Sequence, residues 1–217
     1  MPNLLHLDAS ARRASFSRRL GDRFATAWRA THPGGYVHRD LHAEPVPFID
    51  EAWTEICDEL LRRGITDPAR YAEVVRTPDQ AAAWATLAPL LDELLAADVV
   101  LIATPMYNYS VPAALKAWLD QVTFPRMKLA PRRFVVVSAR GGTYAPGMPR
   151  APFDHQERYL RDFLSGHFGI DEPELVAAEL TNALVDPHLA DQLDAHEASV
   201  AAAFAQVERL ATGERAA

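Results

Sequence analysis

Short apolar runs alternate along the chain with longer stretches in which apolar residues recur every three or four positions. The first kind of pattern predicts strands and the second predicts helices. The most apolar run is 98–103, whose continuous β-branched character is typical of a strand buried on both faces of a parallel sheet. Similar runs predict four further strands at 3–7, 36–41, 133–138 and 174–178. Helical spacing predicts helices over 18–31, 51–63, 78–97, 112–122, 153–166 and 188–210.

This alternation of strands and helices predicts a doubly wound α/β fold. We expect a five-stranded parallel sheet with helices on both faces, formed as a single domain over residues 1–217. A chain of this length can bury a substantial core without dividing into separate units.

Local signals refine the helix boundaries. Ser17 and Ser110 stand before predicted helices as candidate N-caps, and Pro112 suits the first turn of the second of these helices. Pro89 lies within the helix predicted over 78–97, and we expect it to kink that helix or to split it.

The stretch 42–79 has the least regular pattern. Pro45 and Pro47 exclude a central strand there, and the segment is too short for a core of its own. We therefore expect an excursion over the edge of the sheet that resembles a lid.

The net charge, the length of the apolar runs and the cysteine count limit the classes of protein to which this chain can belong. The net charge of −7 argues against general nucleic-acid binding, and no apolar run reaches the length of a membrane span. Cys57 is the only cysteine, so an internal disulfide is impossible, as is typical of a cytoplasmic protein. Cys57 lies on an apolar helix face and is expected to be buried rather than nucleophilic.

Three polar segments follow predicted strands, at 8–17, 104–109 and 138–144. Because ligands of open α/β sheets bind at the carboxyl ends of the strands, we expect these three loops to lie along one edge and to form a site.

Each loop has a ligand-binding interpretation and a purely structural one. Serines and arginines at the start of the first helix suit a phosphate, but they are also compatible with a helix cap and solvated arginines. The second loop offers an aromatic ring and an amide for a flat heterocycle, or an ordinary turn with a left-handed Asn108. The glycines of the third loop permit close ligand approach or simple flexibility.

Other catalytic patterns are missing from the sequence. The histidines are scattered without metal-ligand spacing, and no nucleophile elbow is present. A phosphate loop and two heterocycle loops without an acid–base cluster favour a cofactor that carries the chemistry itself.

The order of these motifs resembles the FMN-dependent NADH-azoreductases, which belong to the flavodoxin-like NAD(P)H:quinone reductases. The similarity rests on the Pro-Met-Tyr-Asn segment 105–108 with the helix start 111–120, on the Ser-Ala-Arg-Gly-Gly segment 138–142, and on the serines of the first loop. Residues 154–160 and 168–170 are also similar to a later helix of that family.

The resemblance implies a flavodoxin-like fold and a bound FMN. It implies that the first loop holds the phosphate and that the other two loops contact the isoalloxazine ring from its two sides. The residues implied to bind the cofactor are Ser10, Ser15, Phe16, Ser17, Pro105, Met106, Tyr107, Asn108, Ser138, Arg140, Gly141 and Gly142.

The resemblance further implies a homodimer that takes electrons from NADH or NADPH and reduces a quinone or azo compound in a ping-pong cycle of hydride transfer. Tyr107 and His167 are candidate substrate contacts, and His155 is a candidate residue of the substrate rim. For either histidine, a packing or surface role is the alternative.

Three other functions remain open. The chain could act on one specialised metabolite as a dedicated flavin reductase or oxidase. It could be a flavodoxin-like electron carrier without a small substrate, or a domain that binds no flavin.

Overall fold

The computed structural model describes residues 1–213. Five parallel strands form one sheet in the order β2-β1-β3-β4-β5. The strands are β1 (Leu4–Asp8), β2 (Tyr36–Asp40), β3 (Val99–Pro105), β4 (Arg133–Ala139) and β5 (Glu174–Ala178). The predicted doubly wound α/β fold is confirmed.

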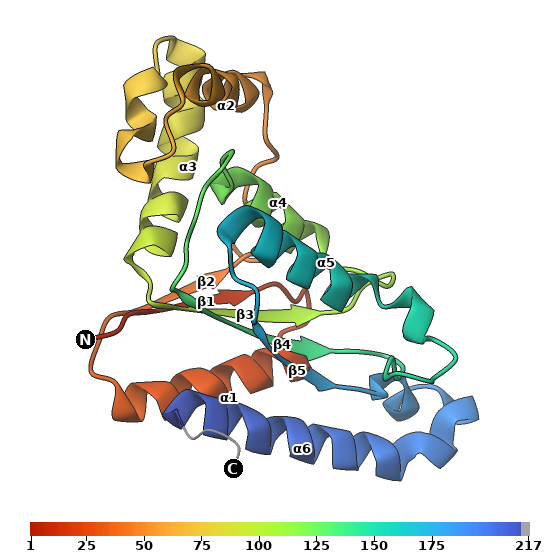
Figure 1. Ribbon diagram of the computed structural model, residues 1–217. Helices are drawn as coiled ribbons and strands as arrows, with labels where there is room; N and C mark the ends of the chain where they lie inside the picture. Colours follow the sequence, from red (N-terminus) through yellow and green to blue (C-terminus); the bar gives the residue numbers. More distant parts are fainter. Residues whose placement is uncertain (214–217) are drawn as a thin grey trace.

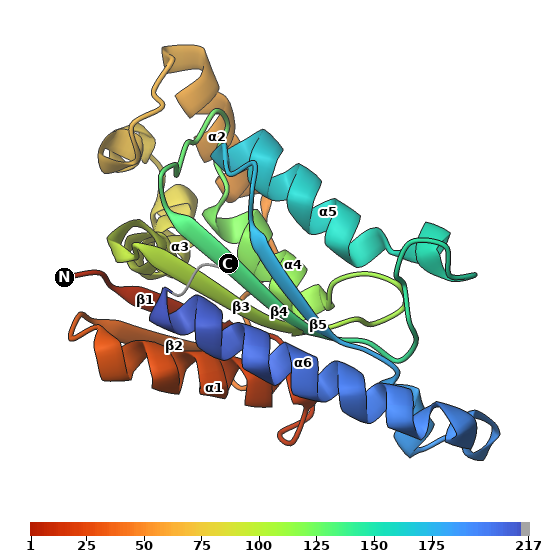
Figure 2. The same ribbon diagram turned by 60° about the horizontal axis from the view of Figure 1, so that its bottom comes forward.

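Helices cover both faces of the sheet (Figure 1). On one face α1 (Phe16–Thr31) and α6 (Leu193–Thr212) lie side by side, as Figure 2 shows. The other face carries α3 (Pro78–Ala96), α4 (Ala113–Val122) and α5 (His155–Phe163), with α2 (Glu51–Arg63) stacked on α3.

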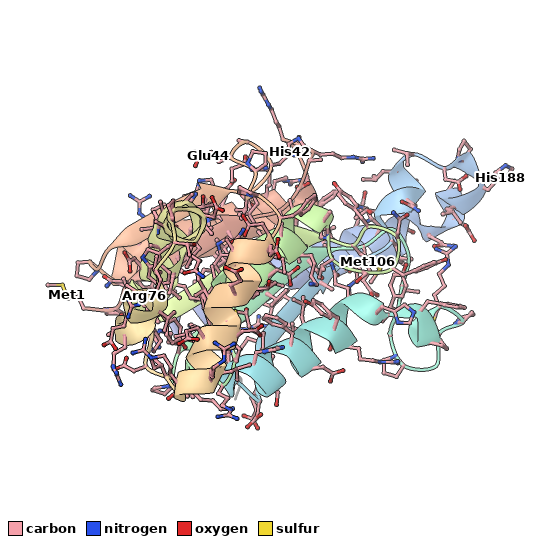
Figure 3. All side chains as sticks on the ribbon, turned by 90° about the horizontal axis from the view of Figure 1, so that it is seen from above. Met1, His42, Glu44, Arg76, Met106 and His188 are labelled. Carbon is pink, nitrogen blue, oxygen red and sulfur yellow. The ribbon has the colours of Figure 1, made fainter. Side chains whose placement is uncertain are left out.

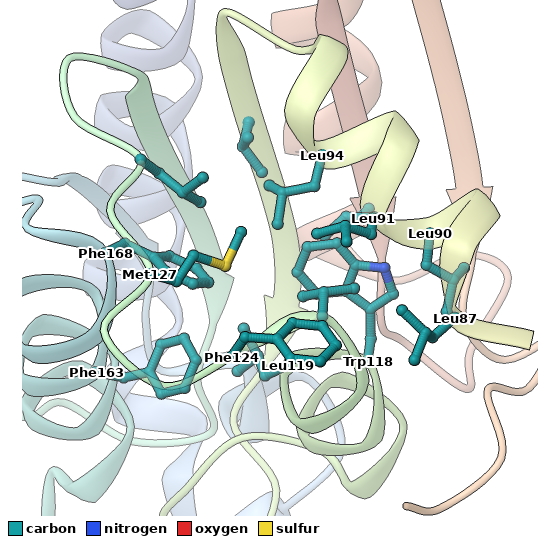
Figure 4. Close-up of a cluster of buried hydrophobic side chains, with 14 of the residues drawn as sticks. Leu87, Leu90, Leu91, Leu94, Trp118, Leu119, Phe124, Met127, Phe163 and Phe168 are labelled. Carbon is teal, nitrogen blue, oxygen red and sulfur yellow. The ribbon is translucent and has the colours of Figure 1, made fainter. Parts of the chain in front are cut away.

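The alternation of side chains along each strand divides the core into two layers. Val99, Leu101 and Ala103 of β3 face α1 and α6, whereas Val100 and Ile102 face the opposite layer. The second layer is the larger one, and aromatic and leucine side chains from α3, α4, α5 and the loop after α4 fill it (Figure 4). Both faces of β3 are therefore buried, as its apolar run predicts.

Two helix starts differ from the sequence prediction. Ser15, not Ser17, caps α1, because its side chain accepts a hydrogen bond from the Arg18 backbone N–H. Pro112 is the N-cap of α4, and no side chain caps it. Ser110 instead exchanges backbone hydrogen bonds with Tyr107.

Pro89 does not split α3, which continues as one helix from Pro78 to Ala96. Thr77 and Gln80 form a capping box at its start, and Leu87, Leu91 and Leu94 are buried on both sides of the proline. Tertiary packing therefore outweighs the lost backbone hydrogen bond.

The segment 42–79 adds to the core of the second layer. Ile56 of α2 is buried, as are Tyr71 and Val74 of a short 3₁₀ helix, Pro68–Val74. The Trp53 indole N–H donates to the Gln121 carbonyl oxygen, which ties α2 to α4. Within the described part of the chain, no residue of 42–79 lines the pocket at the carboxyl ends of the strands. The role of the segment as a lid stays a prediction.

The boundaries of α5 and α6 differ from those predicted from the sequence. A π-turn at Leu164–Phe168 follows α5, and a 3₁₀ segment, Pro187–Gln192, precedes α6, which begins five residues after the predicted start. In the described part of the chain, no helix is at once long enough and apolar enough to cross a bilayer.

Phe24 and Phe48 provide a matched test of this core. Phe24 of α1 is fully buried, whereas Phe48 is 79% exposed. We expect Phe24→Ala to lower the free energy of unfolding by about 3–5 kcal/mol, because a large buried side chain leaves a cavity. Phe48→Ala should change it by no more than about 0.5 kcal/mol. Urea denaturation measures both, and equal losses would contradict the packing described here.

Candidate functional site

A pocket of ≈ 570 Å³ lies at the carboxyl ends of β1, β3, β4 and β5. The three loops expected from the sequence form its walls, with Met106 on the loop after β3 (Figure 3). In the order 2-1-3-4-5 the winding reverses between β1 and β3, and this is the position at which such sheets bind ligands. Of the predicted residues, the pocket is lined by Ser10, Ser15, Phe16, Pro105, Met106, Tyr107, Asn108, Gly141 and Gly142.

The first wall is the loop between β1 and α1. Ser10 and Ser15 reach the pocket, and Arg12 stands exposed beside them. Ser17 lies behind this surface, fully buried, with its hydroxyl 3.2 Å from that of Ser15. The N-terminus of a sixteen-residue helix points its first N–H groups here, which favours a bound anion.

An ion-pair network under this loop determines its shape. The Arg18 guanidinium bonds to Asp8 at 3.1 Å and to Asp40 at 2.8 Å. It also donates to the Ser10 carbonyl oxygen at 2.7 Å. The hydrogen bond from Arg18 lowers the pKa of Asp40 to about 2, so this carboxylate stays charged near neutral pH. Arg18 thereby joins β1, β2 and the serine loop.

The second wall is a tight turn after β3. Tyr107 and Ser110 exchange two backbone hydrogen bonds of 3.0 Å, and both intervening residues have positive φ: 49° at Asn108 and 67° at Tyr109. Two left-handed residues in succession define a type I′ turn. A tyrosine in this conformation is strained. Its ring contacts Phe153 at a centroid distance of 5.5 Å, which helps to hold the turn.

The third wall follows β4. Gly141 and Gly142 line the pocket, but Ser138 and Arg140 do not. The Ser138 hydroxyl lies 3.4 Å from the Val176 carbonyl oxygen. Arg140 is buried and bonds to Asp154 at 2.8 Å. Ala139 and Gly141 line the pocket and alternate with Ser138 and Arg140, which are buried, so the predicted motif is divided between the pocket and the protein interior. Beyond the end of β4 the chain bends, and Gly142 lines the pocket as well.

Gly141 allows the Asn182 side chain to approach closely. A Cβ atom at this position would lie 2.6 Å from the side-chain oxygen of Asn182, whose backbone N–H donates to the Gly141 carbonyl oxygen. Glu179 fixes the rest of the loop by accepting hydrogen bonds from the Thr143 hydroxyl and the Tyr144 backbone N–H.

Neither candidate histidine lines the pocket of this chain. His167 is exposed in the π-turn after α5, where its ring lies 5.0 Å from that of Phe163. His155 is exposed at the start of α5, and its backbone N–H donates to the Tyr109 carbonyl oxygen.

The pocket has a fourth wall that the sequence pattern did not indicate. Residues from the segment after β5 line the pocket, and Leu184 and Val185 are 52% and 74% exposed at its rim. The rule that ligands bind at the carboxyl ends of strands could have identified this segment, because it follows the fifth strand. Arg12, one of the arginines that the sequence offered for a phosphate, lines the pocket. The lining residues that the sequence did not indicate are Ala14, Tyr109, Ala139, Tyr144, Arg150, Thr181, Asn182, Leu184 and Val185.

Charge distinguishes the pocket from the rest of the surface. Its lining contains Arg12 and Arg150 and, among residues 1–213, no aspartate or glutamate. The Arg150 side chain lies over Gly142, where a Cβ atom would be 3.0 Å from its terminal nitrogen. Burial raises the pKa of the Tyr144 phenol, which is thus neutral near pH 7, while Arg150 acts in the opposite direction. The pocket therefore combines positive charge with aromatic and glycine surfaces.

Comparisons with known proteins agree with this geometry. A family model described as having a flavodoxin-like fold matches residues 2–204. An FMN-dependent NADH:quinone oxidoreductase of Nocardia farcinica is 67% identical over 211 residues, which are 97% of this chain and 98% of the relative. A protein of the same name from Streptomyces avermitilis is 42% identical over 214 residues. The aligned part is 94% of this chain and 92% of the relative.

The chain belongs to the flavodoxin-like family of FMN-dependent NADH:quinone oxidoreductases. An azoreductase of Bacillus anthracis has the same fold, with a TM-score of 0.75 at 22% identity over 98% of this chain and all of that one. An FMN-dependent NADH-azoreductase of the same species, solved in complex with FMN, also has a TM-score of 0.75, at 18% identity over 97% of this chain and 98% of the other. The fold and the family implied by the sequence resemblance are confirmed.

Arg140 is buried and ion-paired whereas Arg150 is exposed, and this difference should appear in the stability of variants at the two positions. Arg140 is 5% exposed among Asp154, Glu157 and Glu179, whereas Arg150 stands at the rim. We expect Arg140→Gln to lower the free energy of unfolding by about 3 kcal/mol, because it leaves partly buried carboxylates without their cation. Arg150→Gln should cost no more than about 0.5 kcal/mol. Urea denaturation of both variants tests this, and a stable Arg140 variant would contradict the structural role.

Proposed function

We propose that this chain is an FMN-dependent oxidoreductase that takes electrons from NADH and reduces quinones or azo compounds two electrons at a time. The observation that carries the proposal is the pocket itself, which places an anion-binding helix terminus at one side and a glycine and aromatic surface at the other. The names of the family relatives supply the donor and the quinone class, and the names of the structural neighbours supply the azo class.

The chemistry of the pocket fits FMN at its phosphate end. The Ser10 and Ser15 hydroxyls, the N-terminus of α1 and the guanidinium of Arg12 offer hydrogen bonds and positive charge to a phosphate. Ser17 supports this group from behind through its contact with the Ser15 hydroxyl.

The opposite end fits a flat ring system. Met106 and Tyr107 supply an apolar and aromatic surface, and Gly142 adds no side chain of its own beneath the exposed Arg150 side chain. The volume of ≈ 570 Å³ lies within the range of about 300–1,000 Å³ that is typical of cofactor and small-molecule sites.

The described pocket residues include no carboxylic acid or histidine that could serve as a proton donor at the ring. When bound, FMN supplies the redox chemistry through its isoalloxazine ring. The part of the protein is then to orient the ring against the Tyr107 turn, to offer backbone N–H groups to charge on the ring edge, and to leave room for a second flat molecule.

We further propose that the protein is a homodimer with its active sites at the subunit interface. A second, apolar groove on the far side of the turn shares Tyr107 and Asn108 with the pocket and continues over Lys116 of α4 and Tyr159 of α5. Such an exposed apolar groove next to the pocket supports a partner subunit there. Sedimentation velocity of the purified protein distinguishes monomer from dimer.

The first experiment on function is a visible spectrum of the purified protein with added FMN, followed by anaerobic NADH. We expect FMN to bind saturably at one site per chain. We expect the flavin absorbance to bleach when NADH is added. Reoxidation by a quinone and by an azo dye, each in separate assays, then tests the acceptor class.

Other outcomes separate the alternative functions. Flavin that binds but is not bleached by NADH or NADPH would support an electron carrier. Bleaching without turnover of quinones or azo dyes would support a dedicated reductase for another metabolite. A protein that binds no flavin would refute the proposal.

Substitutions in the first wall test the orientation of FMN. Ser15→Gly retains an acceptable N-cap but removes the hydroxyl, and Arg12→Gln removes the rim charge. We expect either change to weaken FMN binding about tenfold, as the loss of about 1.4 kcal/mol implies. Riboflavin lacks the phosphate, so its affinity should not change. Equal losses for both flavins would place the phosphate elsewhere.

A further inference from the structure

A column of polar side chains lies under α1, on the face of the sheet that is otherwise apolar. The parallel register of β1 and β2 sets His6 opposite His38 and Asp8 opposite Asp40. His6 and Asp8 are almost completely buried, at 0% and 2% exposure, while His38 lies at the edge of the sheet. None of them lines the pocket, so the cluster is separate from the proposed flavin site.

Two buried atoms of this cluster have no hydrogen-bond partner within the described residues. They are His6 Nε2 and Asp8 Oδ1, and they lie 3.7 Å from each other. His6 Nδ1 lies 3.0 Å from the Tyr36 hydroxyl. If this bond carries the ring proton, the lone pair of Nε2 faces the free carboxylate oxygen. A ring nitrogen fixed by a hydrogen bond on its other side is a common arrangement of metal-binding histidines.

His38 completes a set of three ligands. One ligand atom from each of His6, Asp8 and His38 can be chosen so that all three lie within 4.8 Å of one another. His38 Nε2 is 2.8 Å from Asp8 Oδ2, and the His38 side chain is 39% exposed. The cluster is therefore open to solvent on the His38 side, where an ion could enter and a water molecule could complete its coordination.

The charges around the cluster leave room for a cation. The field of three carboxylates, Asp8, Asp22 and Asp40, acts on the single guanidinium of Arg18. Arg18 bonds to Asp8 Oδ2 and thus leaves Oδ1 free.

Gly21 of α1 gives His6 its space. A Cβ atom at this position would lie 2.5 Å from His6 Nε2 and 2.9 Å from the Ala103 Cβ, closer than packed atoms approach. Only glycine lets the helix pass over this nitrogen without displacing it. The missing side chain at Gly21 and the unpartnered Nε2 of His6 are separate observations, and both concern the same ring nitrogen.

We propose that His6, Asp8 and His38 bind a divalent transition-metal ion, Zn²⁺ in the first instance. Two imidazole nitrogens and one carboxylate oxygen suit Zn²⁺, whereas Mg²⁺ and Ca²⁺ prefer sets of oxygen ligands. The ion cross-links β1 to the edge strand β2 beneath the serine loop. Its role is structural, because the cluster does not face the pocket.

The test is calorimetric titration of chelator-treated protein with ZnCl₂ and, separately, with MgCl₂. We expect one Zn²⁺ per chain and no binding of Mg²⁺ at the same concentrations. A Zn²⁺ concentration one hundred times Kd should raise Tm by roughly 5–10 °C for a chain of this size. The measurement needs neither flavin nor activity, so it succeeds or fails independently of the proposed function.

Variants identify the ligands. His38→Gln changes a half-exposed side chain and should weaken Zn²⁺ binding at least tenfold while the metal-free protein stays folded. His42→Gln is the matched control, because His42 is an exposed histidine on the loop that follows β2 (Figure 3). Equal binding by the two variants, or wild-type protein without a stoichiometric site, would overturn the proposal and leave a buried hydrogen-bonded cluster.

Discussion

Parallel hydrogen bonding between β1 and β3, strands more than ninety residues apart in the sequence, places the loops that follow them side by side. Asp8 pairs with Ala103 at the end of this register, so the serine loop and the Tyr107 turn emerge at the same height. β4 and β5 extend the edge and add two further walls. The pocket is thus a consequence of strand order, and its chemistry depends on which residues those loops carry.

The strands and the position of the site were predictable because they depend on short-range patterns. An apolar run between polar loops indicates a buried parallel strand whatever surrounds it, and β3 and β4 follow that rule. The carboxyl-end rule then locates a site without any knowledge of side-chain contacts. The resemblance to quinone reductases and azoreductases supplied the cofactor, which the residues alone did not specify.

The remaining details depend on contacts between distant segments, which no local pattern contains. Arg140 is part of a motif that suggests ligand contact, yet its partly buried carboxylate partners lie at the start of α5 and after β5. Pro89 should break a helix, but the leucines around it are held in the core. His6 and His38 are thirty-two residues apart, and only the β1–β2 register makes them neighbours. In each case contacts between distant segments, and not the local sequence, determine the structure that forms.

The arginines of this acidic chain show how charge is distributed between stability and binding. Arg18 and Arg140 are largely buried and bonded to carboxylates, so their charge is neutralised within the fold. Arg12 and Arg150 form no ion pair within the described residues, and both line the pocket. With a net charge of −7, the protein as a whole repels phosphate-bearing cofactors. Physiological salt screens that repulsion beyond about 8 Å, whereas the two arginines act within the pocket itself. Local unpaired charge, and not net charge, therefore determines which ligands the site attracts.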